Sequence, residues 1–254
     1  FPYTTLFRSK PESNAVLTAY FDSYDNAINA VNEIIKEGVF PAAIDFMDKN
    51  SIITVEKFFP ANLNTSKECM LIIQVDGFLS SLETQIKRVT KALLNSYAVD
   101  INVASDENEI DALWTARRSS FAAAAKLAPD VVSDDIVVPK NHLAEMINYC
   151  KFVCDKYKLQ VCIVGHVGDG NIHPQIVLNL EDDIQFKNYS DAKSEIYKKV
   201  ADLGGTISSE HGVGILKSSY IDKILDSKVI DYMKEIKYLF DSKNILNPGK
   251  IFKV

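Results

Sequence analysis

Residues 15–47 read AVLTAYFDSYDNAINAVNEIIKEGVFPAAIDFM, and this stretch sets the fold expected for the rest of the chain. The apolar run Ala15–Phe21 predicts a strand. Apolar residues then recur at positions 27, 28, 31, 34 and 35, which is the period of an amphipathic helix over Asp25–Glu37, and Gly38 ends it. A second strand is expected over Phe40–Met47. The stretch is therefore a strand, a helix and a strand joined by short connections.

The same order recurs twice further along the chain. Strands are expected at Met70–Val75, Val99–Val103, Ile136–Val138, Leu159–Val164 and Gln175–Leu178, and helices at Ser80–Leu94, Glu107–Leu127, His142–Tyr157, Ile184–Leu203 and Val229–Phe240. This pattern predicts an α+β fold: a ferredoxin-like split antiparallel sheet with helices on one face, plus a helical C-terminal segment. One composite domain is expected over residues 11–254. Residues 1–10, FPYTTLFRSK, join no pattern, and we expect a disordered end or a cloning or sequencing scar.

Composition narrows the class of protein. Of 254 residues, 47% are hydrophobic and 24% are charged, which excludes disordered, collagen-like and coiled-coil proteins. The net charge of −6 argues against a nucleic-acid-binding protein with a broad basic face. The chain has no apolar run of about 18 residues, so we expect no transmembrane segment.

The four cysteines are too few for a disulfide scaffold and indicate a reducing, cytoplasmic setting. Cys150 and Cys154 are four residues apart in a helical pattern. Two buried thiols are favoured there over a metal-binding pair, because a structural metal usually takes four ligands.

Glycine and histidine gather in one part of the sequence. Seven of the ten glycines and three of the four histidines fall between positions 165 and 214. Glycine permits tight turns and close backbone approach, and histidine is the commonest metal ligand and proton carrier near neutral pH. This clustering is the strongest functional signal in the sequence.

The first segment of this region, Gly165–Pro174, reads GHVGDGNIHP between two expected strands. Gly168–Asn171 has the residues of a tight turn, so His166 and His173 are expected at the ends of neighbouring strands. Two imidazoles placed there can share one divalent cation. A glycine-rich hairpin with two structural histidines is the alternative.

The second segment, residues 204–214, reads GGTISSEHGVG. Glu210 supplies a carboxylate that completes a set with His166 and His173. Three protein ligands with an open position are typical of a catalytic metal. His211 is expected to point elsewhere, where it can act as a base. Taken alone, Glu210 and His211 are equally well explained as a surface pair.

The sequence lacks the motifs of several other kinds of functional site. The sequence has no G-x-G-x-x-G after a strand and no P-loop, so it holds no self-contained dinucleotide or nucleotide site. It has neither an H-E-x-x-H zinc helix nor a G-x-S-x-G nucleophile elbow.

Five motifs together resemble one known family. They are W-x-x-R at 114–117, D-x-x-V-P at 135–139, H-x-G-D-G-N-x-H-P at 166–174, E-H-G-[IV]-G at 210–214 and L-N-P-G-K at 246–250. Their order and spacing resemble the C-terminal half of FAD-linked oxidases of the vanillyl-alcohol oxidase superfamily. The branch is that of D-lactate dehydrogenases, the glycolate oxidase flavoprotein subunit and D-2-hydroxyglutarate dehydrogenases.

The resemblance implies a cofactor and partners. Residues 11–254 would form the substrate (cap) domain and C-terminal segment, and FAD would be held mostly by an N-terminal flavin-binding domain that nothing in this sequence matches. The implied reaction is oxidation of a small D-2-hydroxy acid to the 2-oxo acid, with the chain inactive without that domain. Electrons would pass from the flavin to an electron-transferring flavoprotein or an iron–sulfur subunit.

The resemblance also implies roles for the histidines. His166, His173 and Glu210 match positions that hold a divalent metal, which would be zinc, iron or manganese. This metal would bind the 2-hydroxyl and carboxylate of the substrate. His211 matches the base that takes the hydroxyl proton.

Three further residues gain roles in the same way. Arg117 matches the arginine that binds the substrate carboxylate, although without the family an exposed helix charge would be favoured. Asn171 would contact substrate, and Asn247 would approach the flavin. Phe121 and Ser133 stand where the dicarboxylate-specific branch has extra polar residues, which favours a small monocarboxylate such as lactate or glycolate.

Two other classes of protein stay open. A non-catalytic metal- or ligand-binding module that lacks the flavin domain would keep the same clustered residues. An ACT-like regulatory domain would match the strand and helix order alone, and it leaves the histidines and glycines unexplained.

Overall fold

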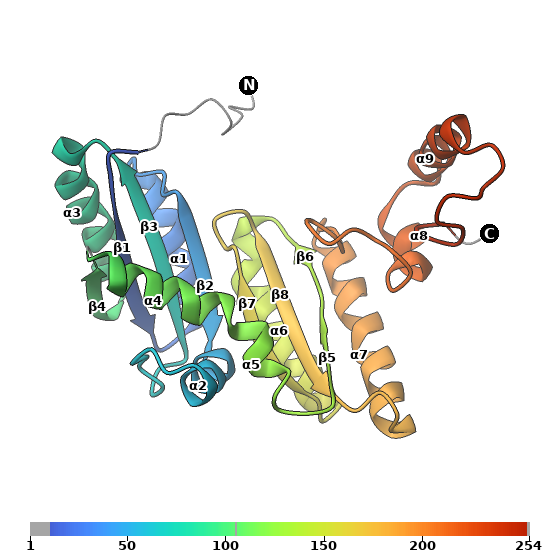
Figure 1. The fold of residues 1–254 in the computed structure, drawn as a ribbon, viewed down its shortest axis with the longest axis horizontal. Coiled ribbons are helices and arrows are strands. Elements are labelled where there is room, and N and C mark those ends of the chain that lie inside the picture. Colours follow the sequence, from blue (N-terminus) through green and yellow to red (C-terminus); the bar gives the residue numbers. More distant parts are fainter. Residues whose placement is uncertain (1–10, 105, 253–254) are drawn as a thin grey trace. The chain divides into compact units, whose positions relative to one another are not determined.

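The computed structural model describes residues 11–104 and 106–252, which form parts of two compact units (Figure 1). The first unit comprises Phe1–Leu127 and Cys162–Gly168, and the second comprises Ala128–Val161 and Asp169–Val254. The expected disordered end or scar at 1–10 lies outside the described residues. Among the helices of the described ranges, none is both long and apolar enough to cross a bilayer.

The first unit is built on an antiparallel sheet. Its strands are β1 (Ser13–Phe21), β2 (Ala43–Asp48), β3 (Cys69–Gly77) and β4 (Val99–Ala104), in the order β4-β1-β3-β2. Ile73 of β3 lies opposite Leu17 of β1 and Ile44 of β2. The other edge of β2 pairs with β7 (Gln160–Gly165), where Phe46 lies opposite Gly165. Consecutive apolar residues make β1 and β3 buried on both faces.

Helices cover both faces of this sheet. The helices α1 (Tyr24–Lys36) and α3 (Leu79–Asn95) pack on one face, and α4 (Glu107–Arg118) crosses the other (Figure 1). The helix α2 (Lys49–Phe58) joins α4 on the second face, where Ile52 and Ala116 enter one apolar cluster with Val16 of β1. The expected α+β fold with an antiparallel sheet is confirmed, and α4 adds a second helical layer to it.

The helix expected over Glu107–Leu127 is two helices. The first, α4, ends at Arg118, and the second, α5 (Ser120–Ala124), is a single short turn after Ser119. Serine is a poor helix former, and two serines in succession weaken the helix at this point. The helix α5 then ends in a tighter turn, where the N–H groups of Lys126 and Leu127 donate to the carbonyl oxygens three residues earlier.

The second unit centres on β8 (Asn171–Leu178). Within this unit, β5 (Asp130–Ser133) and β6 (Ile136–Val137) pair with it antiparallel. The helices of this unit are α6 (Leu143–Lys156), α7 (Asp183–Asp202), α8 (Ile221–Ile224) and α9 (Ser227–Phe240), and short 3₁₀ segments lie at Lys140–His142 and Ser218–Tyr220. The final helices form the helical C-terminal segment that the sequence predicted.

Two glycines let the backbone approach β6 from both sides. A Cβ on Gly170 would lie 2.6 Å from the carbonyl oxygen of Val138, and a Cβ on Gly205 would lie 2.2 Å from that of Val137. The next residue, Thr206, pairs with Val137 through two hydrogen bonds of 2.9 Å. Because no side chain fits at either glycine, these positions bring β8 and the 206–211 segment against the same short strand.

Candidate metal and substrate site

Alternate residues of β8 form a row of buried polar side chains. Asn171, His173 and Gln175 are 1%, 6% and 3% exposed. Because side chains alternate along a strand, all three lie on the same face of β8. The Nδ1 atom of His173 lies 3.2 Å from the carbonyl oxygen of Asp134. A carbonyl only accepts, so Nδ1 carries the proton and the lone pair of the neutral ring is on Nε2.

His166 directly follows β7 and belongs, like Asp45, to the first unit. The Nδ1 atom of His166 lies 2.9 Å from Oδ1 of Asp45, which is buried on β2. The pairing of Phe46 with Gly165 places these two residues side by side. The carboxylate of Asp45 accepts from Nδ1, so the ring presents the lone pair of Nε2 on its other side.

Arg117 lies at the same carboxylate. Its Nε atom is 2.8 Å from Oδ2 of Asp45, and the residue is 8% exposed near the end of α4. Arg117 is therefore a buried cation. The alternative considered from the sequence alone, an exposed charge on a helix, is wrong. One carboxylate joins this arginine to His166.

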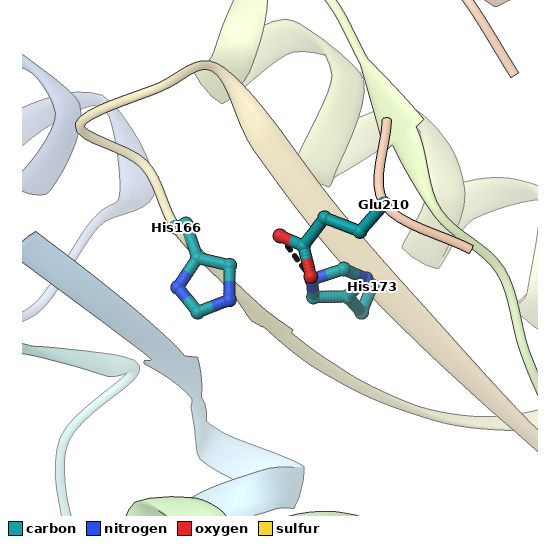
Figure 2. Close-up of side chains that lie close together, drawn as sticks. All are labelled: His166, His173 and Glu210. Carbon is teal, nitrogen blue, oxygen red and sulfur yellow. Dashed lines mark ion pairs between the residues drawn. The ribbon is translucent and has the colours of Figure 1, made fainter. Parts of the chain in front are cut away.

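Glu210 and His211 both lie beside the ring of His173. Oε1 of Glu210 is 4.0 Å from Nε2 of His173 (Figure 2). The ring of His211 stacks on the ring of His173, with centroids 5.2 Å apart and an angle of 12° between the planes. The two neighbours thus reach one imidazole at different places, Glu210 at its nitrogen and His211 on its face.

The three expected metal ligands come together. His166, His173 and Glu210 each offer one ligand atom, and these atoms lie within 4.8 Å of one another (Figure 2). Two imidazole nitrogens and one carboxylate oxygen are a donor set suited to zinc or another first-row divalent metal. The chemistry of the donors therefore fits the metal that the sequence led us to expect.

Asn171 contacts a predicted ligand. Its Nδ2 atom donates to Oε1 of Glu210 at 3.0 Å. Its Oδ1 atom is buried and has no hydrogen-bond partner among the described residues. Asn171 therefore orients the Glu210 carboxylate, a role that the sequence did not indicate, and its expected contact with substrate stays a prediction.

The segment that carries Glu210 is anchored on Asp135. Oδ2 of Asp135 accepts from the backbone N–H groups of Ser209, Glu210 and His211 at 2.7, 2.8 and 2.9 Å. Burial opposes ionisation of this carboxyl, but the three N–H bonds and nearby Lys217 outweigh burial and lower its pKa to about 2. Asp135 is therefore a carboxylate at neutral pH.

Two buried lysines hold the chain on either side of this segment. Nζ of Lys217 donates to the carbonyl oxygen of Ile207 at 2.7 Å, and Nζ of Lys193 donates to that of Leu216 at 3.3 Å. Burial lowers the pKa of both ammonium groups. Their role is to fix the path of the chain around Glu210 and His211.

The remaining predicted positions lie apart from these contacts. Asn247 is exposed in the terminal turn, with a left-handed φ of 49°. Phe121 is 47% exposed on α5, and Ser133 pairs with Gln175 across β5 and β8. Gln175 was not predicted, although its even spacing from Asn171 and His173 is a signal that the sequence contains.

The cysteines are buried and form no disulfide. Burial raises the pKa of the Cys154 thiol to about 12 and that of Cys150 well above its ordinary value. The prediction of buried thiols on one face of a helix is confirmed.

Comparison with known proteins places the chain in a family. The family described as FAD linked oxidases, C-terminal domain, matches residues 10–251, and the chain belongs to it. The glycolate oxidase subunit GlcD of Bacillus subtilis is 35% identical over 243 residues, which cover 96% of this chain and 52% of that protein. A probable mitochondrial D-lactate dehydrogenase of Danio rerio is 29% identical and aligns with 96% of this chain and 49% of its own length.

Solved structures show the same fold. The p-cresol methylhydroxylase structure with substrate bound has a TM-score of 0.71 at 13% identity, covering 96% of this chain and 54% of that chain. The 4-ethylphenol oxidase of Gulosibacter chungangensis in complex with isoeugenol has a TM-score of 0.66 at 16% identity, covering 97% and 55%. The chain spans about half the length of the curated relatives it matches.

Proposed function

We propose that this chain is the substrate- and metal-binding portion of an FAD-dependent dehydrogenase. The substrate is a small D-2-hydroxy acid, lactate or glycolate, and the product is the 2-oxo acid. The relatives named glycolate oxidase subunit and D-lactate dehydrogenase support this reaction. FAD is held mostly by a separate flavin-binding portion, and an electron-transferring flavoprotein or an iron–sulfur subunit takes the electrons. The four buried thiols suit a reducing compartment, and we expect the cytoplasm.

The orientation of the two histidines carries the proposal. Nδ1 of His166 donates to Asp45 and Nδ1 of His173 donates to a backbone carbonyl, which leaves Nε2 of each ring as the ligand atom. Metal-binding histidines characteristically donate their second nitrogen to an oxygen in this way. Glu210 would supply the third ligand, and the substrate would take a fourth position on the cation.

The roles of the chain's residues follow from this arrangement. The bound cation would withdraw charge from the 2-hydroxyl oxygen and lower its pKa. His211 takes the hydroxyl proton on a ring nitrogen, and Arg117 binds the substrate carboxylate with its planar fork. FAD, when bound, would supply the acceptor for the hydride that leaves C2. Asn247 in the terminal turn would approach the flavin, and Asn171 holds Glu210 in place.

A non-catalytic metal- or ligand-binding module is the second candidate. It would use the same cluster of His166, His173 and Glu210, which offers three ligand atoms without any contribution from a flavin. Such a module would bind the cation and a hydroxy acid without turnover.

A fusion protein distinguishes the two candidates. We suggest joining this chain to the part of the Bacillus subtilis relative that it does not cover, and recording the absorbance of oxidised flavin without oxygen. We expect D-lactate or glycolate to bleach the flavin, whereas L-lactate and D-2-hydroxyglutarate do so poorly. Bleaching by none of these acids, in a fusion that is folded and holds both FAD and metal, would favour the non-catalytic module.

A further inference from the structure

Asp135 is not one of the three proposed metal ligands, but its side chain anchors the segment that carries Glu210 and His211. It is 0% exposed and lies between β5 and β6. Its Oδ2 atom accepts four hydrogen bonds, three from the backbone N–H groups of residues 209–211 and one from Oγ of Ser208 at 3.2 Å.

Three consecutive N–H groups converge on one oxygen only when the backbone wraps around it. In an extended strand, neighbouring N–H groups point in opposite directions, so residues 209–211 are not extended. This curved conformation sets the directions in which the side chains of Glu210 and His211 leave the backbone. Both directions lead to His173.

The same part of the chain also places His173. The carbonyl oxygen of Asp134 accepts from Nδ1 of His173, and Oδ1 of Asp135 lies 3.9 Å from that nitrogen. Residues 134 and 135 therefore set the position of the His173 ring and of the segment that reaches it.

We infer that Asp135 is a positioning residue: its carboxylate holds residues 208–211 so that Glu210 and His211 reach the cation and the substrate. The inference rests on the proposed function, because the cation site is part of that function. It adds a residue that acts through Glu210 and His211 and does not bind the cation itself.

The test compares two aspartates whose carboxylates accept backbone N–H groups. Asp135→Asn keeps the shape of the side chain and removes its charge, and Asp182→Asn is the matched control. The Asp182 side chain caps α7, where its Oδ1 atom accepts from the N–H groups of Ile184 and Gln185 at 2.9 and 3.1 Å. Zn²⁺ affinity of this chain is measured by competition with a chelator, alongside Glu210→Gln as a reference for a lost ligand.

We expect Asp135→Asn to weaken Zn²⁺ binding by about 10- to 100-fold, as is usual for residues that orient metal ligands, and Asp182→Asn to change it by less than about threefold. Wild-type affinity in a folded Asp135→Asn variant, with weakened binding in Glu210→Gln, would overturn the inference and leave the proposed function standing. Unchanged affinity in Glu210→Gln as well would overturn the proposed function.

Amide exchange in the unmutated chain gives a second test that does not depend on a variant folding. If Asp135 arranges the segment in advance, the amides of Ser209, Glu210 and His211 are protected before any metal is added. Adding Zn²⁺ should then change their exchange little. Rapid exchange without Zn²⁺ and protection only with it would show that the metal, and not Asp135, orders the segment.

Discussion

Nδ1 of His166 donates to Oδ1 of Asp45 at 2.9 Å, and Asp45 is 4% exposed. The other oxygen of this carboxylate lies 2.8 Å from Nε of Arg117. A single buried side chain thus contacts both a proposed metal ligand and the proposed substrate-binding arginine. This relationship links the two binding functions through one residue of β2.

Replacing Asp45 tests this link. Asp45→Asn removes the charged acceptor that fixes the His166 ring, so we expect Zn²⁺ affinity to fall about 10- to 100-fold. Asp111→Asn, at an exposed position on α4, is the control and should bind Zn²⁺ as the wild type does. Equal affinities in the two variants would show that the contact with Asp45 does not orient His166.

Substitutions of Glu210 and His211 should have different effects, because we assign metal binding to Glu210 and proton transfer to His211. In the active FAD-containing enzyme, Glu210→Gln should lose metal and weaken substrate binding. His211→Asn should keep the metal and lower kcat by about 10²- to 10⁴-fold, the range for a lost general base. Metal content and steady-state rates of both variants give the answer. Metal loss in His211→Asn but not in Glu210→Gln would mean that the two roles are reversed.

Arg117 should act on the substrate and not on the metal. Arg117→Lys keeps the charge but loses the planar fork, so we expect KM to rise by about 10-fold or more in the active enzyme. Zn²⁺ affinity should change far less. The matched control is Arg118→Lys, because Arg118 is the next residue of α4 and is exposed. A similar small effect in both variants would count against carboxylate binding by Arg117.

Protonation of Asp135 in acid should lower the free energy of unfolding of the chain. The pKa of Asp135 is about 2 in the folded chain and its ordinary value is 3.8. A lowered pKa stabilises the fold above the ordinary value, and this stabilisation of about 2 kcal/mol is lost as pH falls from about 4 to about 2. Urea unfolding should show wild type more stable than Asp135→Asn at pH 7, with the difference shrinking toward pH 2.5. A constant difference would contradict the role of the charge.

Local patterns in the sequence predicted most elements, but they missed the helix α2, the strand β5 and the short helix α8. The stretch Lys49–Phe58 contains Ile52, Ile53 and Val55, and such β-branched residues do not favour a helix. A side-chain cap nevertheless stabilises the start of this helix, because Asp48 accepts from the backbone N–H of Ser51 at 2.9 Å. Packing of Ile52 and Val55 in the core then stabilises α2.

The start of β8 was also placed too late. The expected strand began at Gln175, directly after Pro174, whose missing N–H group makes it uncommon inside a sheet. In the structure β8 begins at Asn171, and the carbonyl oxygen of Pro174 accepts from the N–H of Asp134.

The ligand residues could be predicted because each lies in a short motif, but the residues that orient them could not. Asp45 is 121 positions from His166, and Asp135 is 75 positions from Glu210. Such contacts depend on strand register and on the path of the chain around β6. We expected His211 to point elsewhere than Glu210, as adjacent side chains of an extended segment do. The bonds to Asp135 show that this segment is curved.

The metal content of the purified chain tests the central claim most directly. Elemental analysis should find about one equivalent of zinc, iron or manganese, as three ligands with an open position can hold one cation. His166→Ala/His173→Ala should abolish that occupancy, while His142→Ala, at a half-buried histidine before α6 and outside the ligand cluster, should leave it unchanged. Full occupancy in the double variant would contradict the account.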